Sequence, residues 1–150
     1  MRAHQLAEPF PTVSLDADAM TAARLMAAGR SPGLIVCGYD ERPYTVLPGS
    51  QVLNFIVPRY IQEQPALARA LDERASDELR DQLAQHTVLD VLPDAAHIDE
   101  LPIVDSDSTI IEVAAVMARM HSPLVAVVDG DGLVLGAITV SRLLAYFLPS

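Results

Sequence analysis

The residues of this chain that could do chemistry gather at one turn near its C-terminal end. Residues 136–142 read Gly-Ala-Ile-Thr-Val-Ser-Arg, an apolar strand that passes through small and hydroxylated residues into an amphipathic helix. Thr139 and Ser141 supply hydroxyls, and the free N–H groups of a helix start favour an anion. Arg142 adds five hydrogen-bond donors and no acceptor. The turn is therefore a candidate site for a phosphate or a carboxylate.

Three interpretations of Arg142 are compatible with the sequence. It can bind an anion at the positive end of the last helix. It can reach an acidic group across a dimer interface or on a partner protein. The third interpretation, the ordinary one for a helix-start arginine, is a solvated side chain or an internal ion pair with a nearby acid.

The elements that position this turn occur twice in the chain. A shift of 91 positions lays residues 11–58 over residues 102–149 without a gap. Identical residues then coincide, including Met26 with Met117 and a Ser-Pro pair in each copy. Self-similarity at a fixed spacing is the signature of one supersecondary unit used more than once. The two copies are therefore expected to share one fold.

Each copy predicts a strand, a helix, two strands and a second helix. In the second copy Val113 and Met117 recur at helical spacing. Apolar strands are expected at 124–128 and 133–138, and the Asp-Gly-Asp-Gly between them is typical of a hairpin. Ser141 is expected to cap the last helix. The predicted fold class is α/β (α+β), with two β-α-β-β-α units.

This arrangement resembles a pair of cystathionine-β-synthase (CBS) domains, also called a Bateman module. The resemblance covers most of the chain and is carried by the Ser-Pro pair before an apolar strand in each copy, and by Asp-Gly-Asp-Gly followed by Gly-Ala-Ile-Thr in the second. It implies that the two units pack through their sheets about a pseudo-twofold axis, and that two modules often pair into a flat disk.

The resemblance also implies a function. Family members commonly bind adenine nucleotides or S-adenosylmethionine in clefts between the units and regulate an attached or associated protein. The expected ligands are therefore AMP, ATP or S-adenosylmethionine, or another small anion, and a partner protein is expected to be regulated. The alternative is a dimerisation or protein-interaction module whose nucleotide site has degenerated.

Nucleotide-binding members tend to end the third strand with Gly-x-x-Thr-x-x-Asp, in which the Thr and the helix start face phosphates and the Asp accepts hydrogen bonds from ribose hydroxyls. Gly136 and Thr139 match this motif, but Arg142 stands where the Asp belongs. In the first copy Pro48 and Gln51 occupy the Thr and Asp positions. Neither copy therefore offers the family's ribose acceptor.

His121 and Arg30 stand directly before the two Ser-Pro pairs, where related modules often place phosphate-facing groups; a solvated helix end is the alternative. By this resemblance the expected ligand cleft of the second copy is lined by Val104, His121, Ser122, Pro123, Leu124, Gly136, Thr139, Ser141 and Arg142. A second, more degenerate cleft is expected at Arg30, Ser31, Pro32, Pro48, Ser50 and Gln51.

The segment between the copies predicts a helix rather than a loose linker. Pro65 can open it, and Leu67, Leu71 and Leu83 fall on one side. This apolar stripe can cover its own module, a second chain or a partner. The expected boundaries are a first CBS domain at 1–58, a helical linker at 59–86 and a second CBS domain at 87–150.

Composition excludes several classes of function. Ten arginines and no lysine against twenty acids give a net charge of −10, so nucleic acids and anionic membranes are poor partners. The single cysteine, Cys37, cannot form an internal disulfide, which favours a reducing, cytoplasmic setting. The residue pattern contains no activated nucleophile, carboxylate pair or metal-ligand spacing, so neither an enzyme nor a metal site is expected. Methionines at 20, 26, 117 and 120 fall at helical spacing and are expected to fill the core or an interface. The helical faces around them, with the stripe through Leu67 and Leu71, present more apolar surface than a single module needs, so a homodimer is expected.

Overall fold

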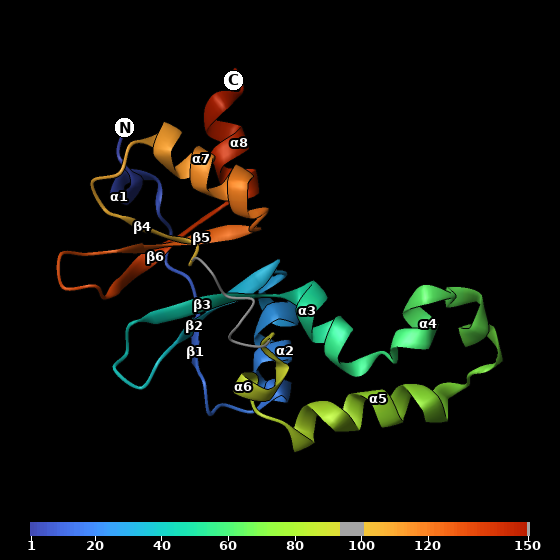
Figure 1. Ribbon diagram of the computed structural model, residues 1–150. Helices are drawn as coiled ribbons and strands as arrows, with labels where there is room; N and C mark the ends of the chain where they lie inside the picture. The colour runs from blue at the N-terminus through green and yellow to red at the C-terminus, as the bar shows by residue number, and fades with distance from the viewer. Residues whose placement is uncertain (94–100, 150) are drawn as a thin grey trace.

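The computed structural model describes residues 1–93 and 101–149. The first unit consists of β1 (Thr12–Ser14), α2 (Ala19–Gly29), β2 (Gly33–Cys37), β3 (Pro43–Pro48) and α3 (Gly49–Ile56). The second unit consists of β4 (Ile103–Asp105), α7 (Ile110–Met120), β5 (Leu124–Val128), β6 (Val134–Thr139) and α8 (Val140–Phe147). The predicted β-α-β-β-α order is confirmed in both copies. The two sheets lie in the middle of the molecule, and helices cover their outer faces (Figure 1).

The two three-stranded sheets have the same topology and register. Each has a parallel pair followed by an antiparallel pair, in the orders β1-β2-β3 and β4-β5-β6. Thr12 pairs with Ile35, and at equivalent positions Ile103 pairs with Ala126. A register shift follows Val36 in one hairpin and its counterpart in the other. The repeat found in the sequence is therefore a repeat of structure.

The sheets pack on each other through a small apolar layer. Ile35 and Val46 of the first unit meet Leu124, Ala126 and Ala137 of the second, all buried. Ile35 is the repeat counterpart of Ala126, and Val46 that of Ala137, so each unit contributes matching positions. Such reciprocal contacts are those of two units related by a pseudo-twofold axis.

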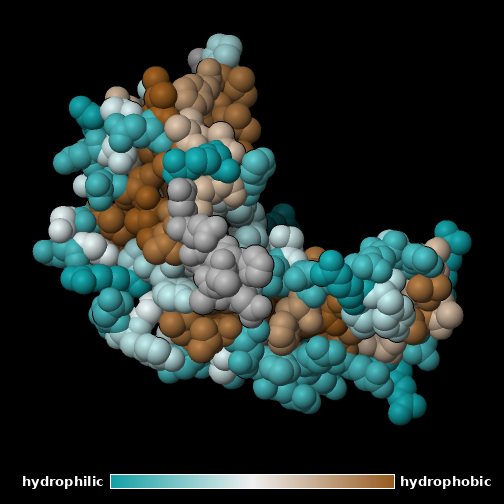
Figure 2. Space-filling view, in the orientation of Figure 1, coloured by the Kyte–Doolittle hydropathy of each residue, from teal (hydrophilic) through white to brown (hydrophobic). Residues whose placement is uncertain are grey.

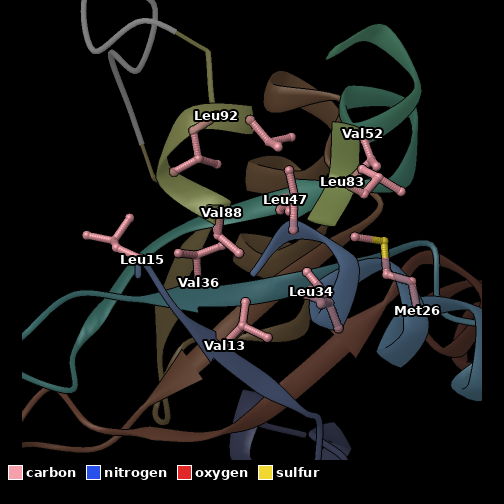
Figure 3. Packing of buried hydrophobic residues seen from close by; sticks show 13 residues of the cluster. Val13, Leu15, Met26, Leu34, Val36, Leu47, Val52, Leu83, Val88 and Leu92 are labelled. Carbon is pink, nitrogen blue, oxygen red and sulfur yellow. The ribbon is translucent and has the colours of Figure 1, made fainter. Parts of the chain in front are cut away.

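Each unit also has its own core between its sheet and its helices. In the first unit Leu34 and Val36 of β2 are fully buried and face side chains from the helices and the inter-repeat segment (Figure 3). Met26 and Met117, expected in the core or at an interface, are only 7% and 5% exposed and belong to the cores of their units. They therefore add no apolar surface for a dimer, because the helical stripe that carries them faces the sheet of its own unit.

Two four-residue helices cross over to the opposite unit. Helix α1 (Ala3–Leu6) packs on the second unit, where Ala3 is completely buried and its N–H donates to the Ser108 carbonyl (2.8 Å). Helix α6 (Val88–Val91) packs on the first unit, where the Val88 N–H donates to the Ala17 carbonyl (2.8 Å). Ala17 and Ser108 are repeat counterparts, so the exchange is symmetric. The domain boundaries 1–58, 59–86 and 87–150 remain a prediction. Helices α1 and α6 each pack on the unit that lies on the other side of these boundaries.

Helix α6 has a well-defined start. Its capping residue Thr87 donates its N–H to the Asp90 carboxylate (2.9 Å), and the Asp90 N–H donates to the Thr87 hydroxyl (3.4 Å). The hydrogen bond from the Thr87 N–H is the main reason that the pKa of Asp90 lies below its usual value. This reciprocal cap fixes the entry into a helix that is too short to be stable by itself.

The inter-repeat segment is three short helices rather than one. It consists of α4 (Arg59–Glu63), the 3-10 helix η1 (Pro65–Ala70) and α5 (Glu73–Gln85), which form an arm that extends away from the sheets (Figure 1). The prediction of a single helix from Pro65 is wrong because Leu71 is extended and the Asp72 carboxylate caps a new helix by accepting the Ala75 N–H (3.2 Å). Of the predicted stripe, Leu83 is buried, whereas Leu67 and Leu71 are exposed. Within the described residues, no helix has the length and apolarity to cross a membrane.

Gly136 allows the N-terminal segment to lie on β6. Glu8 exchanges two backbone hydrogen bonds of 2.9 Å with Ala137, and a Cβ on Gly136 would overlap the Glu8 backbone. Gly136→Ala should therefore lower the free energy of unfolding by about 1–3 kcal/mol, as overpacking does. Gly130→Ala is the matched control in the same hairpin, because a Cβ there has open space. Urea denaturation that gives equal stabilities for the two variants would contradict this packing.

Candidate functional site

Two clefts with hydroxylated and basic residues in their lining lie between the units. The cleft that we call the Arg30 cleft has a volume of about 450 Å³ and is lined by Arg30, Ser31, Pro32, Pro123, Thr139, Val140, Ser141 and Leu144. The second, the His121 cleft, has a volume of about 230 Å³ and is lined by Thr45, Val46, Pro48, Ser50, Gln51, Pro93, Pro102, Met120, His121, Ser122 and Pro123. A further cavity that includes Pro32, Pro48, Pro123 and Val140 adjoins both. The clefts therefore sit on either side of the pseudo-twofold axis.

Each cleft takes its residues from both units. Thr139 and Ser141 at the start of α8 face Arg30 and Ser31 of the first unit, and Gln51 at the start of α3 belongs with residues of the second. The residues predicted from the sequence were grouped by repeat, whereas each cavity of the structure combines residues of both repeats. Sheets that pack about a twofold axis bring the third-strand end of one unit against the helix-to-strand turn of the other, so every cleft is composite.

Four of the predicted lining residues lie outside the two clefts, and one of them, Arg142, is described below. Val104 belongs to the core of the second unit, and Leu124 to the layer between the sheets. Gly136 lies beneath the Glu8 backbone and lines a different cavity. The apolar side chains that flank the motifs are thus required for packing, while the hydroxylated and cationic residues face the clefts.

Arg30 and His121 end the first long helix of their units in the same unusual conformation. Both cap residues have positive φ angles, 50° for Arg30 and 51° for His121, a region that residues other than glycine adopt uncommonly. Within residues 1–93 and 101–149, the side chain of Arg30 makes no hydrogen bond or ion pair. Its exposed cation is therefore free to meet a ligand at the rim of its cleft.

The start of α8 is organised by Thr139 rather than by Ser141. The Thr139 hydroxyl accepts the Arg142 N–H (3.3 Å), so Thr139 is the cap, and the prediction that Ser141 caps this helix is wrong. The Ser141 hydroxyl lies 3.3 Å from that of Thr139. At the equivalent position in the first unit, Pro48 has no hydroxyl with which to cap α3. With Ser31, the Arg30 cleft thus presents three hydroxyl-bearing residues and one cation.

The Arg142 side chain is held by its own chain. Its Nε donates to the carbonyl oxygen of Leu6 (2.9 Å), and its Nη1 lies 3.0 Å from a carboxylate oxygen of Glu8. Leu6 is the last residue of α1, where helix carbonyls have no partner within the helix. Of the three interpretations, the structure shows the internal ion pair. Arg142 fastens the end of α1 to the start of α8.

Gln51 does the same in the other repeat. Its side-chain amide donates to the carbonyl oxygen of Val91 (2.9 Å), the last residue of α6. Gln51 and Arg142 are repeat counterparts, and Leu6 and Val91 occupy the same place in the two exchanged helices. Two chemically different side chains therefore form one contact, and what they share is a hydrogen-bond donor.

This shared contact does not fit the family's way of binding ribose. A carboxylate at either position offers only acceptors and would face a carbonyl oxygen. The Gln51 amide and the Arg142 guanidinium already donate to backbone carbonyls of the chain. In the second repeat the Glu8 carboxylate also lies beside the Arg142 guanidinium. The residues of both clefts thus match the expectation for phosphate-facing groups better than that for ribose-facing groups.

Comparison with known proteins identifies the family. The model of the CBS domain family matches residues 94–149. The crystal structure of a CBS domain-containing protein of unknown function from Kribbella flavida DSM 17836 is 49% identical to this chain, covers 99% of both chains and has a TM-score of 0.83. This chain belongs to the CBS domain family. No curated protein matches it.

More distant CBS structures share the fold alone. The CBS domain of a membrane protein from Sphaerobacter thermophilus is 21% identical over 100% of this chain and 90% of its own, with a TM-score of 0.72. The structure of CBSX2 in complex with AMP is 15% identical over 97% and 95%, with a TM-score of 0.67. Together with the first structure, they show that the molecule is a tandem CBS pair.

The exchanged helices and the role of Glu8 had no prediction from the sequence. The repeat register of 91 positions does not extend to them, since Leu6 and Val91 are 85 positions apart. A search that allowed the short helices their own offset could have paired them. The contact with Glu8 has no local signal, because it joins residues at opposite ends of the chain.

Arg142 should matter for stability through its donor rather than its charge. We expect Arg142→Ala to lower the free energy of unfolding by about 1–2 kcal/mol, because it removes a part-buried, charge-assisted hydrogen bond. Arg142→Gln should lose clearly less, since glutamine makes this contact in the other repeat. Arg59→Ala is the control, because the pair of Arg59 with Glu63 is almost fully exposed. Equal losses for Arg142→Ala and Arg142→Gln in urea denaturation would contradict the donor role.

Proposed function

We propose that this CBS pair is a stand-alone regulatory module that senses a small anion in the Arg30 cleft and thereby modulates a partner protein. The observation that carries the proposal is the pair of equivalent hydrogen bonds from Arg142 and Gln51 to the exchanged helices. These bonds use the two positions at which the family would hold a ribose. The proposed ligand is therefore recognised by its anionic group.

The chemistry of the Arg30 cleft supports an anionic ligand. A free guanidinium stands at its rim, and the hydroxyls of Ser31 and Ser141 lie within it. The cleft also faces the start of α8, where N–H groups without helical partners add positive potential. Arg–phosphate and Arg–carboxylate hydrogen bonds are short and strong because both partners are charged.

A ligand in this cleft would contact both units at once. Arg30 belongs to the turn after α2, and Ser141 to the first turn of α8. An anion that bridges them favours one spacing of the units, and a partner that prefers that spacing would bind more tightly. This is the physical form that regulation takes in the proposal.

The second candidate is a ligand-free dimerisation or interaction module. It is favoured by apolar side chains that lie outside the cores on α3 and α8, where Leu53 is 60%, Leu144 54% and Phe147 50% exposed. Figure 2 shows hydrophobic surface over α8. The predicted homodimer would bury these faces, and light scattering should then give twice the 16.2 kDa chain mass.

Isothermal titration calorimetry separates the candidates. Inorganic phosphate and AMP should bind with comparable affinity, and adenosine should give no heat, because recognition rests on the anion. ATP and S-adenosylmethionine should likewise bind only through their anionic groups. Arg30→Ala should weaken phosphate binding by about tenfold. Arg24→Ala, which removes the same charge from the exposed side of α2, should not.

Two results would contradict the sensing proposal. Binding of adenosine as tight as that of AMP would mean that a ribose or adenine site is present. The second result is that no compound gives heat while the wild-type protein forms a dimer. The interaction module would then be the function.

A further inference from the structure

Another cavity lies away from both clefts, at the opposite ends of the strands. It has a volume of about 610 Å³, larger than either cleft. It opens between β1 and β6, which both lie at sheet edges, and is bounded by the last residue of β2, Cys37, and by the hairpin residues Glu41 and Leu133. A volume of this size suits a small organic molecule.

The polar lining of this cavity breaks the pseudo-symmetry of the repeat. Thr12 and Cys37 line it from the first unit, whereas the equivalent positions of the second unit hold Ile103 and Val128. Val128 is buried in its sheet, while Cys37 is only half-buried. The fold therefore accepts apolar residues at these positions, so packing alone does not require the hydroxyl and the thiol.

The charge of the cavity is opposite to that of the Arg30 cleft. Among its lining residues Glu41 alone is charged, and no lining residue is basic. Burial raises the pKa of the Cys37 thiol, which therefore stays neutral near pH 7. The neighbouring Arg42 side chain lies against Gly132, on the turn outside the lining. A phosphate-bearing ligand would meet repulsion from Glu41, and no residue of the lining supplies a compensating cation.

Glu41 is fixed at the rim of the cavity by an unusual turn. Its φ angle is 64°, its N–H donates to the Gly38 carbonyl (3.0 Å), and the Gly38 N–H donates to the Arg42 carbonyl (2.8 Å). Phe10, Leu133 and Leu135 supply apolar surface to the same cavity. The cavity thus combines one acceptor-only charge with an aromatic and aliphatic surface.

From this arrangement we infer that the cavity binds a small organic cation, an amine whose ammonium group donates to the Glu41 carboxylate and whose apolar body lies against Phe10 and Leu135. This site is independent of the anion proposed for the Arg30 cleft. The two sites select ligands of opposite charge, because a free arginine borders one and a glutamate borders the other.

The single cysteine provides the test, because it lines the cavity and alkylation of the intact chain reports only on it. Phenethylamine is the probe, and 3-phenylpropionate, which has the same ring and the opposite charge, is its control. Phenethylamine should slow the modification of Cys37 by iodoacetamide, followed by mass spectrometry, with half-protection at roughly millimolar concentration, as expected for so small a ligand. Phenylpropionate should protect much less.

Two variants locate the binding. Glu41→Gln keeps the size of the side chain and should weaken protection by about three- to fivefold, the effect of one exposed ion pair. Glu78→Gln, on the arm, should leave it unchanged. Leu135→Arg, which places a cation at a half-exposed position of the lining, should abolish it while circular dichroism remains native. Equal protection by both probes, protection that survives Glu41→Gln, or no protection at about tenfold above the expected concentration would overturn the proposal.

Discussion

The structure depends on one hydrogen bond made twice, from a side chain at the start of a unit's second helix to the last carbonyl of an exchanged helix. Helices of four residues are not stable in isolation, because so few hydrogen bonds cannot offset the cost of starting a helix. Here α1 and α6 persist because the opposite unit buries Ala3 and Val88 and because Arg142 and Gln51 satisfy their terminal carbonyls. Each unit therefore packs against the short helix that precedes the other unit in the chain.

This constraint also decides what the clefts can recognise. A side chain that donates to a carbonyl cannot be an acceptor-only carboxylate, so a position that fastens an exchanged helix is lost as a ribose acceptor. In the second unit Glu8 follows α1 onto β6, and the absence of a side chain at Gly136 lets its backbone approach. What remains open to a ligand in the Arg30 cleft is a cation and hydroxyls. Recognition of an anion is therefore consistent with the use of Gln51 and Arg142 as donors to the exchanged helices.

The sequence predicted what depends on local patterns. The spacing of Val113 and Met117, the hairpin residues and the 91-position repeat were enough for the order of the elements. The composite clefts could not be predicted in the same way. Arg30 and Ser141 line one cleft only because of how the two sheets pack. The arm was mistaken for one helix because Asp72 can cap a helix or lie within one, and here the backbone bond to Ala75 decided between the two. Arg142 was recognised as the informative residue, but its partners Leu6 and Glu8 lie at the other end of the chain.

Hydrogen exchange of a variant with both donors replaced, Gln51→Asp with Arg142→Asp, tests the central claim most directly. Exchange is read at the amides of Ala3 and Val88, which bond to the opposite units in the native chain. We predict that both amides lose protection together while the central strands β2 and β5 stay protected, because each new carboxylate repels a helix-terminal carbonyl. Retention of native protection at both helices would show that the two side chains do not hold the exchange, and would contradict the account.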